Sequence, residues 1–291
     1  MVRRSRRALL RWYEPRRDAY PWRKIRDPYR IWVSEIMLQQ TQAPRVVAAY
    51  RAFLRKFPSL RSLAAAPRRD VVAAWGDLGY NRRAVALSEA ARAVVREFGG
   101  RFPAEPSDLR RLPGVGPYTA AAVSSLAFGL PVAAVDTNVR RIVTRFFFGS
   151  EAHALTAGRI ADAAQRWIAP DEPGAWTQAL MDLGREICRP RPRCQDCPIS
   201  QTCRFISAVA VPKPQRRRQP PFEGSARQVR GAVVRILRSR SRSTLHELAR
   251  ASGFPLERIV AAVATLRADG LVSAGPAALR GSPSGVARLA S

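Results

Sequence analysis

The four cysteines of this chain lie within one sixteen-residue stretch, at positions Cys188, Cys194, Cys197 and Cys203, with the spacing C-x5-C-x2-C-x5-C. Clustered thiolates at fixed spacing suit a soft metal centre, because one short loop must bring all four sulfurs around a small cluster. Four cysteines also serve zinc. The residues alone therefore predict a metal centre and leave an iron–sulfur cluster and a zinc ion as alternatives.

The rest of the 291-residue chain is strongly basic, with 50 Lys and Arg against 22 Asp and Glu and a net charge of +28. Such an excess favours nucleic acids, because cationic side chains release the counterions of phosphate backbones. A general enrichment in arginine is the alternative. With 46% hydrophobic residues the chain can bury a core, which excludes wholesale disorder.

No segment of the chain predicts export or insertion into a membrane. The basic stretch Met1–Leu10 lacks the apolar run of a signal peptide, and no stretch approaches the ~20 apolar residues of a membrane span. We therefore expect a cytoplasmic, nucleoid-associated protein with no membrane partner. In that reducing compartment clustered cysteines serve as ligands rather than disulfides.

Residues 1–205 predict an all-α domain. Apolar residues recur at three- and four-residue steps, which is the period of a helix, and strand-like alternation is scarce. The clearest expected helices are Val46–Phe57, Arg68–Trp75, Arg83–Phe98, Tyr118–Phe128, Asn138–Phe147 and Ala157–Ile168.

Beyond this domain the composition changes. Residues 206–224 are rich in proline and arginine and indicate a basic linker. Residues 225–291 predict a small winged-helix-like domain, with one helix at Gln228–Arg238, a helix-turn-helix over 244–269 and a short hairpin opening at Gly270.

Two further motifs suit contacts with DNA and its sugar. The run Leu112-Pro-Gly-Val-Gly-Pro-Tyr-Thr119 predicts a tight hairpin between two helices, whose backbone N–H groups can approach a phosphate. An ordinary helix–helix turn is the alternative. Asp136 follows about twenty residues later, and alone it would be a helix N-cap.

Together, the glycine hairpin, the aspartate and the four-cysteine loop resemble the helix-hairpin-helix DNA glycosylase superfamily. Further segments closely resemble the MutY-type adenine DNA glycosylases, and the resemblance covers about residues 8–205. The segments that carry it are 21–23 (PWR), 27–29 (DPY), 32–42 (WVSEIMLQQTQ), 78–80 (LGY) with Arg83, and 178–184 (QALMDLG). The run 227–231 (RQVRG) resembles the short C-terminal region of actinobacterial members.

The resemblance implies a catalytic group of four residues. Glu35, flanked by apolar side chains, would keep its proton and act as the general acid that releases the base. Asp136 would stabilise the oxocarbenium-like sugar, with Asn138 and Tyr118 hydrogen-bonding around it. Endonuclease-III-type relatives carry a lysine in place of Tyr118, so the resemblance implies base excision without strong strand cleavage.

The resemblance also implies three sets of binding residues. Trp22, Arg23, Leu38 and Gln178 would hold the adenine, and Gln40 and Tyr80 would wedge into the duplex beside the flipped nucleotide. For Trp22 and Tyr80, core packing is the alternative. The residues expected to contact phosphates are Gly114, Val115 and Gly116 of the hairpin and Arg189, Arg191 and Arg193 of the cysteine loop. The implied cofactor is a [4Fe–4S] cluster on Cys188, Cys194, Cys197 and Cys203.

The expected function is that of a monomeric, monofunctional DNA glycosylase of base excision repair, which acts on double-stranded DNA and removes adenine opposite 8-oxoguanine or guanine. A thymine or uracil mismatch glycosylase of the same fold and a non-catalytic iron–sulfur DNA-binding regulator are the alternatives. The Gln39-Gln40-Thr41 run and Gln178 favour adenine, and the pair Glu35 and Asp136 favours an enzyme.

The chain departs from the family pattern at three points. Residues 225–291 are not similar to the Nudix-like domain with which many members read 8-oxoguanine. The gap between the first two cysteines is five residues, where relatives commonly have six. Asn81 stands where many relatives have a tyrosine.

Overall fold

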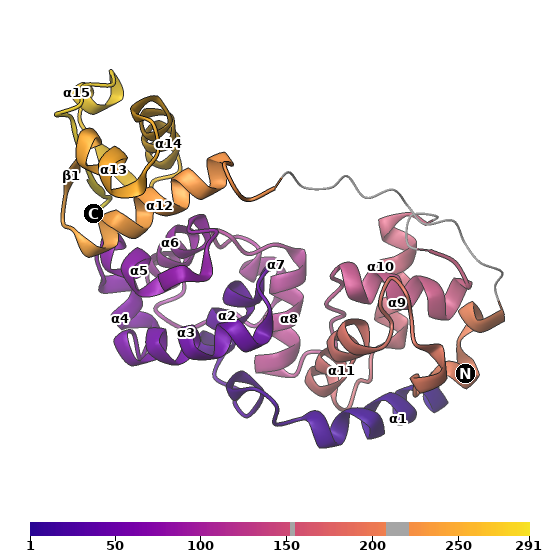
Figure 1. Cartoon of the computed structure of the whole chain (residues 1–291). Helices are drawn as coiled ribbons and strands as arrows, with labels where there is room; N and C mark the ends of the chain where they lie inside the picture. Colours follow the sequence, from indigo (N-terminus) through magenta and orange to yellow (C-terminus); the bar gives the residue numbers. More distant parts are fainter. Residues whose placement is uncertain (152–154, 208–220) are drawn as a thin grey trace. The chain divides into compact units, whose positions relative to one another are not determined.

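The structure is a computed structural model that describes residues 1–151, 155–207 and 221–291. These residues form two compact units (Figure 1). The first comprises Met1–Gln39 and Arg101–Pro214, and the second comprises Gln40–Gly100 and Gln215–Ser291. Most of the predicted linker 206–224 lies outside the described residues.

The first unit is helical throughout its described residues. Its main helices are α1 (Val2–Tyr13), α2 (Pro28–Leu38), α7 (Pro106–Leu109), α8 (Pro117–Phe128), α9 (Thr137–Phe148), α10 (Ala157–Trp167) and α11 (Pro173–Glu186). Short 3-10 helices are η1 (Glu14–Arg16), η2 (Pro21–Arg23), η5 (Cys194–Asp196), η6 (Ser200–Thr202) and η7 (Arg204–Ser207). Several helices begin with a proline in the first turn, where no N–H is needed.

A stack of aromatic rings forms the centre of the core that holds α9, α10 and α11 together. Phe146 stacks on Trp167 with ring centroids 4.1 Å apart, and Trp167 meets Trp176 edge-on at 5.1 Å. All three side chains are buried. Each such ring removes a large apolar area from water, and the edge-on geometry adds to this. This core fixes the two helices from which Asp136 and the cysteine loop extend.

The second unit combines helices from the middle of the chain with its C-terminal region. The former are α3 (Ala43–Lys56), α4 (Leu60–Ala65), α5 (Arg68–Trp75), η3 (Gly76–Leu78) and α6 (Arg82–Glu97). Ion pairs Arg238–Asp77, at 2.8 Å, and Arg82–Asp269, at 3.4 Å, join the two parts. Asp77 and Arg82 are largely exposed, so each pair contributes little to stability.

The C-terminal region contains the predicted helix-turn-helix and a small antiparallel sheet. Its elements are α12 (Ala226–Ser239), β1 (Ser243–Thr244), α13 (Leu245–Ser252), α14 (Leu256–Ala268), β2 (Val272–Ala274), α15 (Pro276–Leu279) and β3 (Val286–Leu289). The strand order is β1-β3-β2, with Ser243 opposite Ala287 and Val272 opposite Leu289. The short helix α15 separates β2 from β3, where the sequence predicted a short hairpin.

The predicted fold class is confirmed. Each of the six expected helices is present and begins and ends within three residues of its predicted bounds. The described part of residues 1–207 contains no strand. None of the helices that the structure describes is long and apolar enough to cross a membrane.

Helices α9 and α11 approach so closely that Gly184 leaves no room for a side chain. A Cβ atom there would lie 2.6 Å from the Cβ atom of Asn138 and 3.3 Å from Cδ1 of Ile142. We expect Gly184→Ala to lower the free energy of unfolding by about 1–3 kcal/mol, because the helices must move apart. Chemical denaturation measures this change.

The matched control is Gly158→Ala on α10, where a Cβ atom would meet nothing within 4 Å. This variant should be neutral or more stable by up to ~1 kcal/mol, because alanine restricts the unfolded chain. Equal stability of the Gly184→Ala protein and the wild type would contradict the close packing of α9 on α11.

Candidate active site

Glu35 lies on α2 with its side chain buried, at 2% exposure. The Tyr118 hydroxyl, from the start of α8, donates a hydrogen bond of 3.0 Å to Oε2 of Glu35. Burial raises the pKa of Glu35 to about 7; the Tyr118 hydrogen bond and the charge of Arg23 oppose this shift, and the charge of Asp136 adds to it. The carboxyl therefore carries its proton in a large fraction of molecules at neutral pH.

Tyr118 remains a neutral hydrogen-bond donor. Burial raises the pKa of its hydroxyl well above the usual value, and the charges of Glu35 and Asp136 raise it further. The same oxygen lies 3.5 Å from Sδ of Met181 on α11. Tyr118 is thus held between α2 and α11 and fixes the position of the Glu35 carboxyl.

Asp136 caps the N-terminus of α9. Its Oδ1 accepts hydrogen bonds from the backbone N–H groups of Asn138 and Val139, at 2.9 and 2.7 Å, and its Oδ2 accepts one of 3.0 Å from Nδ2 of Asn138. The N-cap that the sequence offered as the alternative is therefore present. It orients a half-buried carboxylate at the positive end of a helix.

Asn138 is itself held by Arg141, one turn further along α9. Nη2 of Arg141 donates to Oδ1 of Asn138 at 2.9 Å and to the carbonyl of Gly184 at 3.0 Å. Nε of Arg141 donates to the carbonyl of Cys188 at 2.7 Å. A continuous series of hydrogen bonds thus joins Asp136 to the main chain of the first cysteine.

The four residues expected to hold a base belong to the first unit. Trp22 and Gln178 are buried, at 4% and 8% exposure, and Leu38 is half-buried at the end of α2. Trp22 stacks on Tyr20 with ring centroids 5.1 Å apart.

Arg23 lies in a buried ion pair. Its two terminal nitrogens donate to the carboxylate oxygens of Asp182, at 2.9 and 2.7 Å, and both side chains are almost completely buried. Removing one partner of such a pair leaves an uncompensated charge. Arg23 therefore stabilises the fold, whatever it also contributes to binding.

Gln40 and Tyr80 belong to the second unit and share a rare backbone conformation. They are the only non-glycine residues with a positive φ among the residues that the structure describes, at 56° and 48°. Both are exposed, Tyr80 at 51%. The left-handed conformation costs about 1–2 kcal/mol per residue, and such strain is concentrated at functional sites.

The predicted hairpin lies between α7 and α8. Gly114 has a φ of 74°, the backbone N–H of Val115 donates to the carbonyl of Leu112 at 3.1 Å, and Gly116 precedes the first residue of α8. The side chain of Val115 is buried, at 6% exposure. The buried side chain of Val115 therefore does not face a phosphate.

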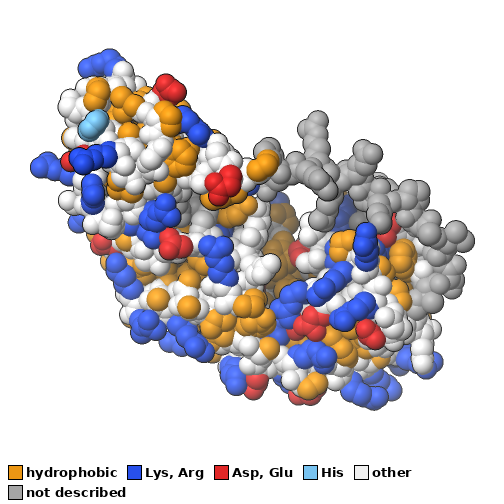
Figure 2. All heavy atoms as spheres, in the orientation of Figure 1, with side chains coloured by type: hydrophobic (Ala, Val, Ile, Leu, Met, Phe, Trp, Pro, Cys, Tyr) orange, Lys and Arg blue, Asp and Glu red, His pale blue; other side chains and the backbone are white. Residues whose placement is uncertain are grey.

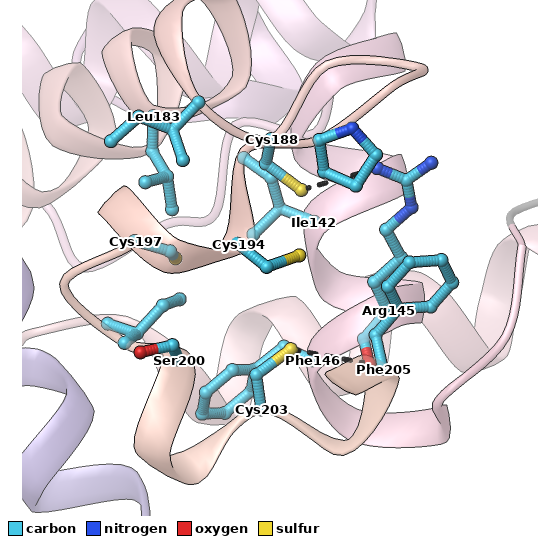
Figure 3. A pocket seen from close by; sticks show the side chains of 13 residues that line it. Ile142, Arg145, Phe146, Leu183, Cys188, Cys194, Cys197, Ser200, Cys203 and Phe205 are labelled. Carbon is cyan, nitrogen blue, oxygen red and sulfur yellow. Dashed lines mark hydrogen bonds between the residues drawn. The ribbon is translucent and has the colours of Figure 1, made fainter. Parts of the chain in front are cut away.

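The four cysteines line a single cavity (Figure 3). Apolar side chains such as Ile142, Leu183 and Ile199 form much of the remaining wall. Burial raises the pKa of the Cys197 thiol to about 12, and a hydrogen bond from the backbone of Ile199 opposes this shift. The described residues contain no three His, Cys, Asp or Glu side chains already converging on one ion position.

Among the residues that the structure describes, Arg145 on α9 is the only charged side chain that lines this cavity. It is 2% exposed, and its Nη1 lies 3.6 Å from Sγ of Cys188. It also donates to the carbonyls of Arg189 and Pro190 and pairs with Glu151 at 2.7 Å. Arg145 thus fixes the first turn of the cysteine loop.

The three loop arginines expected to contact phosphates, Arg189, Arg191 and Arg193, are exposed. Nε of Arg189 donates to the carbonyl of Arg185, and Nη2 of Arg193 donates to that of Glu186. Two of the three side chains are therefore held in place by the end of α11. Lys and Arg also outnumber Asp and Glu on the face drawn in Figure 2.

Sequence analysis missed Arg141, Arg145, Met181 and Asp182 as parts of the site. Arg141 and Arg145 are four residues apart and share one face of α9. That spacing was the only signal, and it is weak in a chain with 50 Lys and Arg. Several of their partners are backbone carbonyls, which no side-chain motif indicates.

The fold and site have counterparts among known proteins. The sequence model of the HhH-GPD superfamily of base excision DNA repair proteins matches residues 33–170. Among solved structures, a thermostable thymine-DNA glycosylase is similar, with a TM-score of 0.64 and 34% identity over 69% of this chain and 94% of that chain. An endonuclease III bound to DNA, at 23% identity and a TM-score of 0.58, shares the fold.

Curated relatives are similar over most of the chain. An adenine DNA glycosylase of Mycolicibacterium smegmatis is 41% identical over 233 residues, which cover 79% of each protein. The adenine DNA glycosylase of Homo sapiens is 40% identical over 69% of this chain. The chain covers only 39% of the human protein and 42% of its counterpart in Rattus norvegicus.

The fold and these comparisons place the chain in the HhH-GPD superfamily of base excision DNA repair proteins. Within that superfamily, the chain belongs to the adenine DNA glycosylase family.

The buried Glu35 carboxyl should make stability depend on pH. In the unfolded chain it ionises near its ordinary value of 4.5, and in the folded chain at about 7. Folding therefore takes up a proton between these values, and the contribution of Glu35 to stability falls as pH rises through this window. We expect Glu35→Gln to gain stability relative to the wild type over this range, reaching ~3 kcal/mol above pH 7.

Denaturation at pH 5 and pH 8 measures the difference. The control is Glu257→Gln on α14, an exposed position where burial adds no penalty. A gain for Glu35→Gln that is equal at both pH values would contradict the raised pKa.

Proposed function

We propose that this chain is a monofunctional DNA glycosylase that excises adenine opposite 8-oxoguanine or guanine in double-stranded DNA. The observation that carries this proposal is the buried Glu35 carboxyl, whose pKa of about 7 leaves it protonated in a large fraction of molecules near neutral pH. Asp136 supplies a second carboxyl group on the same unit. A protein that only bound DNA would have no use for this pair of carboxyl groups.

The reaction follows from the two carboxyl groups. An adenine that has left the base stack is a poor leaving group until a ring nitrogen is protonated. Glu35 donates that proton, and the electrons of the glycosidic C–N bond leave with the base. Asp136 stabilises the positive sugar. Water then adds to the sugar carbon, and a carboxylate takes up the released proton.

Tyr118 separates base excision from strand cleavage. Cleavage through a Schiff base requires an amine at the sugar carbon. Tyr118 carries a hydroxyl group instead of an amine, and this hydroxyl donates a hydrogen bond to Glu35. The product is therefore an abasic site in an uncut strand.

The choice of base rests on Trp22, Arg23, Leu38 and Gln178. The carboxamide of Gln178 can both donate and accept, as the edge of adenine requires. The second candidate is removal of thymine opposite guanine, which the similarity to a thymine-DNA glycosylase supports. A panel of duplexes distinguishes the two.

The proposed cofactor is a [4Fe–4S] cluster held by Cys188, Cys194, Cys197 and Cys203. The four thiols border one cavity, and the buried Arg145 cation suits a cluster with four thiolates, which has a net negative charge. Bound there, the cluster would supply rigidity to the loop that carries Arg189, Arg191 and Arg193.

We expect single-turnover excision to be fastest on adenine opposite 8-oxoguanine, slower opposite guanine, and slow on thymine or uracil opposite guanine. Strand breaks should appear only after alkali. Glu35→Gln should lower the excision rate 100- to 10,000-fold, because the proton donor is lost. Gel analysis of labelled strands with and without alkali measures all of these rates.

In this assay the exposed Glu257→Gln variant is the control and should excise at the wild-type rate. Faster excision of thymine or uracil than of adenine would show that adenine is not the preferred substrate. Robust strand cleavage without alkali would contradict the role of Tyr118, and a fully active Glu35→Gln protein would contradict the mechanism.

The purified protein should contain about four iron and four sulfide ions per chain, with broad visible absorption. Cys197→Ser should lose most of this iron, because three thiolates hold the cluster less firmly. Elemental analysis and visible spectroscopy measure both quantities. One zinc ion per chain and no iron would show that the zinc alternative is correct.

A further inference from the structure

Two exposed loops of the second unit contain a strained residue each. Gln40 precedes α3 and Tyr80 precedes α6, and they alone among the described non-glycine residues have left-handed backbones. A left-handed residue other than glycine persists only where its surroundings hold it.

One side chain contacts both loops. Nη2 of Arg83, on α6, donates to Oγ1 of Thr41 at 3.2 Å and to the carbonyl of Gly79 at 3.2 Å. Thr41 is the residue after Gln40, and Gly79 is the residue before Tyr80. The two hydrogen bonds of a single nitrogen therefore join the loops next to their strained residues.

The guanidinium of Arg83 also lies near two aromatic rings. Its Cζ atom is 5.2 Å from the ring centroid of Trp75 and 5.4 Å from that of Tyr80. Nε1 of Trp75 donates to the same Gly79 carbonyl at 3.0 Å. A planar guanidinium that contacts aromatic rings and donates hydrogen bonds has a more fixed orientation than a flexible lysine.

We propose that Arg83 is a positioning residue that holds Gln40 and Tyr80 in the conformation from which their side chains enter the DNA duplex. This proposal rests on the proposed function, because it takes the two residues as the wedge beside the flipped nucleotide. Arg83 touches neither the base nor the sugar in this account. It acts by ordering both loops before DNA binds, so that less freedom is lost on binding.

The test measures base flipping separately from chemistry. A 2-aminopurine base beside the target adenine becomes fluorescent when the adenine leaves the stack, and single-turnover excision is followed on the same duplex. Arg83→Met keeps the apolar stem and removes both hydrogen bonds and the charge. Arg83→Lys keeps the charge and a donor, and it remains informative if the Met variant folds poorly.

The matched control is Arg92→Met on the same helix. Arg92 is also half-buried and donates two hydrogen bonds, to the carbonyls of Ala64 and Ala66 at the end of α4. Its loss should affect the stability of the fold without affecting the two loops. Thermal unfolding of all variants shows how much of each effect is structural.

We expect Arg83→Met to lower the flipping signal and the excision rate at saturating protein at least tenfold, with Arg83→Lys intermediate and Arg92→Met unchanged. The combined variant Arg83→Met with Tyr80→Ala should be no slower than the slower single variant, because both changes disable the same wedge.

Normal flipping by a folded Arg83→Met or Arg83→Lys protein would overturn the role of Arg83. If Gln40→Ala and Tyr80→Ala also flip normally, the wedge itself is wrong. If they are defective while the Arg83 variants are normal, only the positioning role of Arg83 fails.

Discussion

The proposed chemistry depends on one buried interaction, the hydrogen bond from the Tyr118 hydroxyl to the Glu35 carboxyl group. A carboxyl group keeps its proton at neutral pH only where water is excluded and no cation neutralises it. Helix α2 provides this environment, because every residue from Ile31 to Met37 is buried and Trp32 packs against Phe102. The packing of α2 on α8 therefore determines the chemistry as well as the fold. A substitution that admits water beside Glu35 would lower the pKa of its carboxyl group, even if Glu35 itself is unchanged.

The second carboxyl group, that of Asp136, lies in polar surroundings. Asp136 accepts three N–H hydrogen bonds at a helix N-terminus, which fix the orientation of its side chain. In the proposed mechanism the two carboxyl groups, in different surroundings, would take different roles, one as acid and one as stabiliser of positive charge. The position of Asp136 depends in turn on Asn138 and Arg141, and Arg141 bonds to the carbonyl of Cys188. The position of Asp136 therefore depends on the fold of the cysteine loop.

The sequence predicted the helices well, because an apolar stripe at helical period is a local signal. It also predicted roles for Glu35, Tyr118 and Asp136 from their motifs; these roles stay predictions, and the structure shows that Tyr118 donates a hydrogen bond to Glu35. The contacts of Arg23, Arg83 and Arg141 could not be predicted. Arg23 meets Asp182, which is 159 residues away in the chain, and Arg83 and Arg141 bond largely to carbonyls that every residue possesses. The cluster, the base and the DNA contacts remain predictions.

The most direct test of the central claim is the pH dependence of single-turnover adenine excision by the wild-type protein with saturating enzyme. If Glu35 supplies the proton, the rate should be high below the pKa of about 7 and fall tenfold per pH unit above it. A rate that rises through pH 7, or one that is constant to pH 9, would show that the protonated Glu35 carboxyl does not drive the reaction.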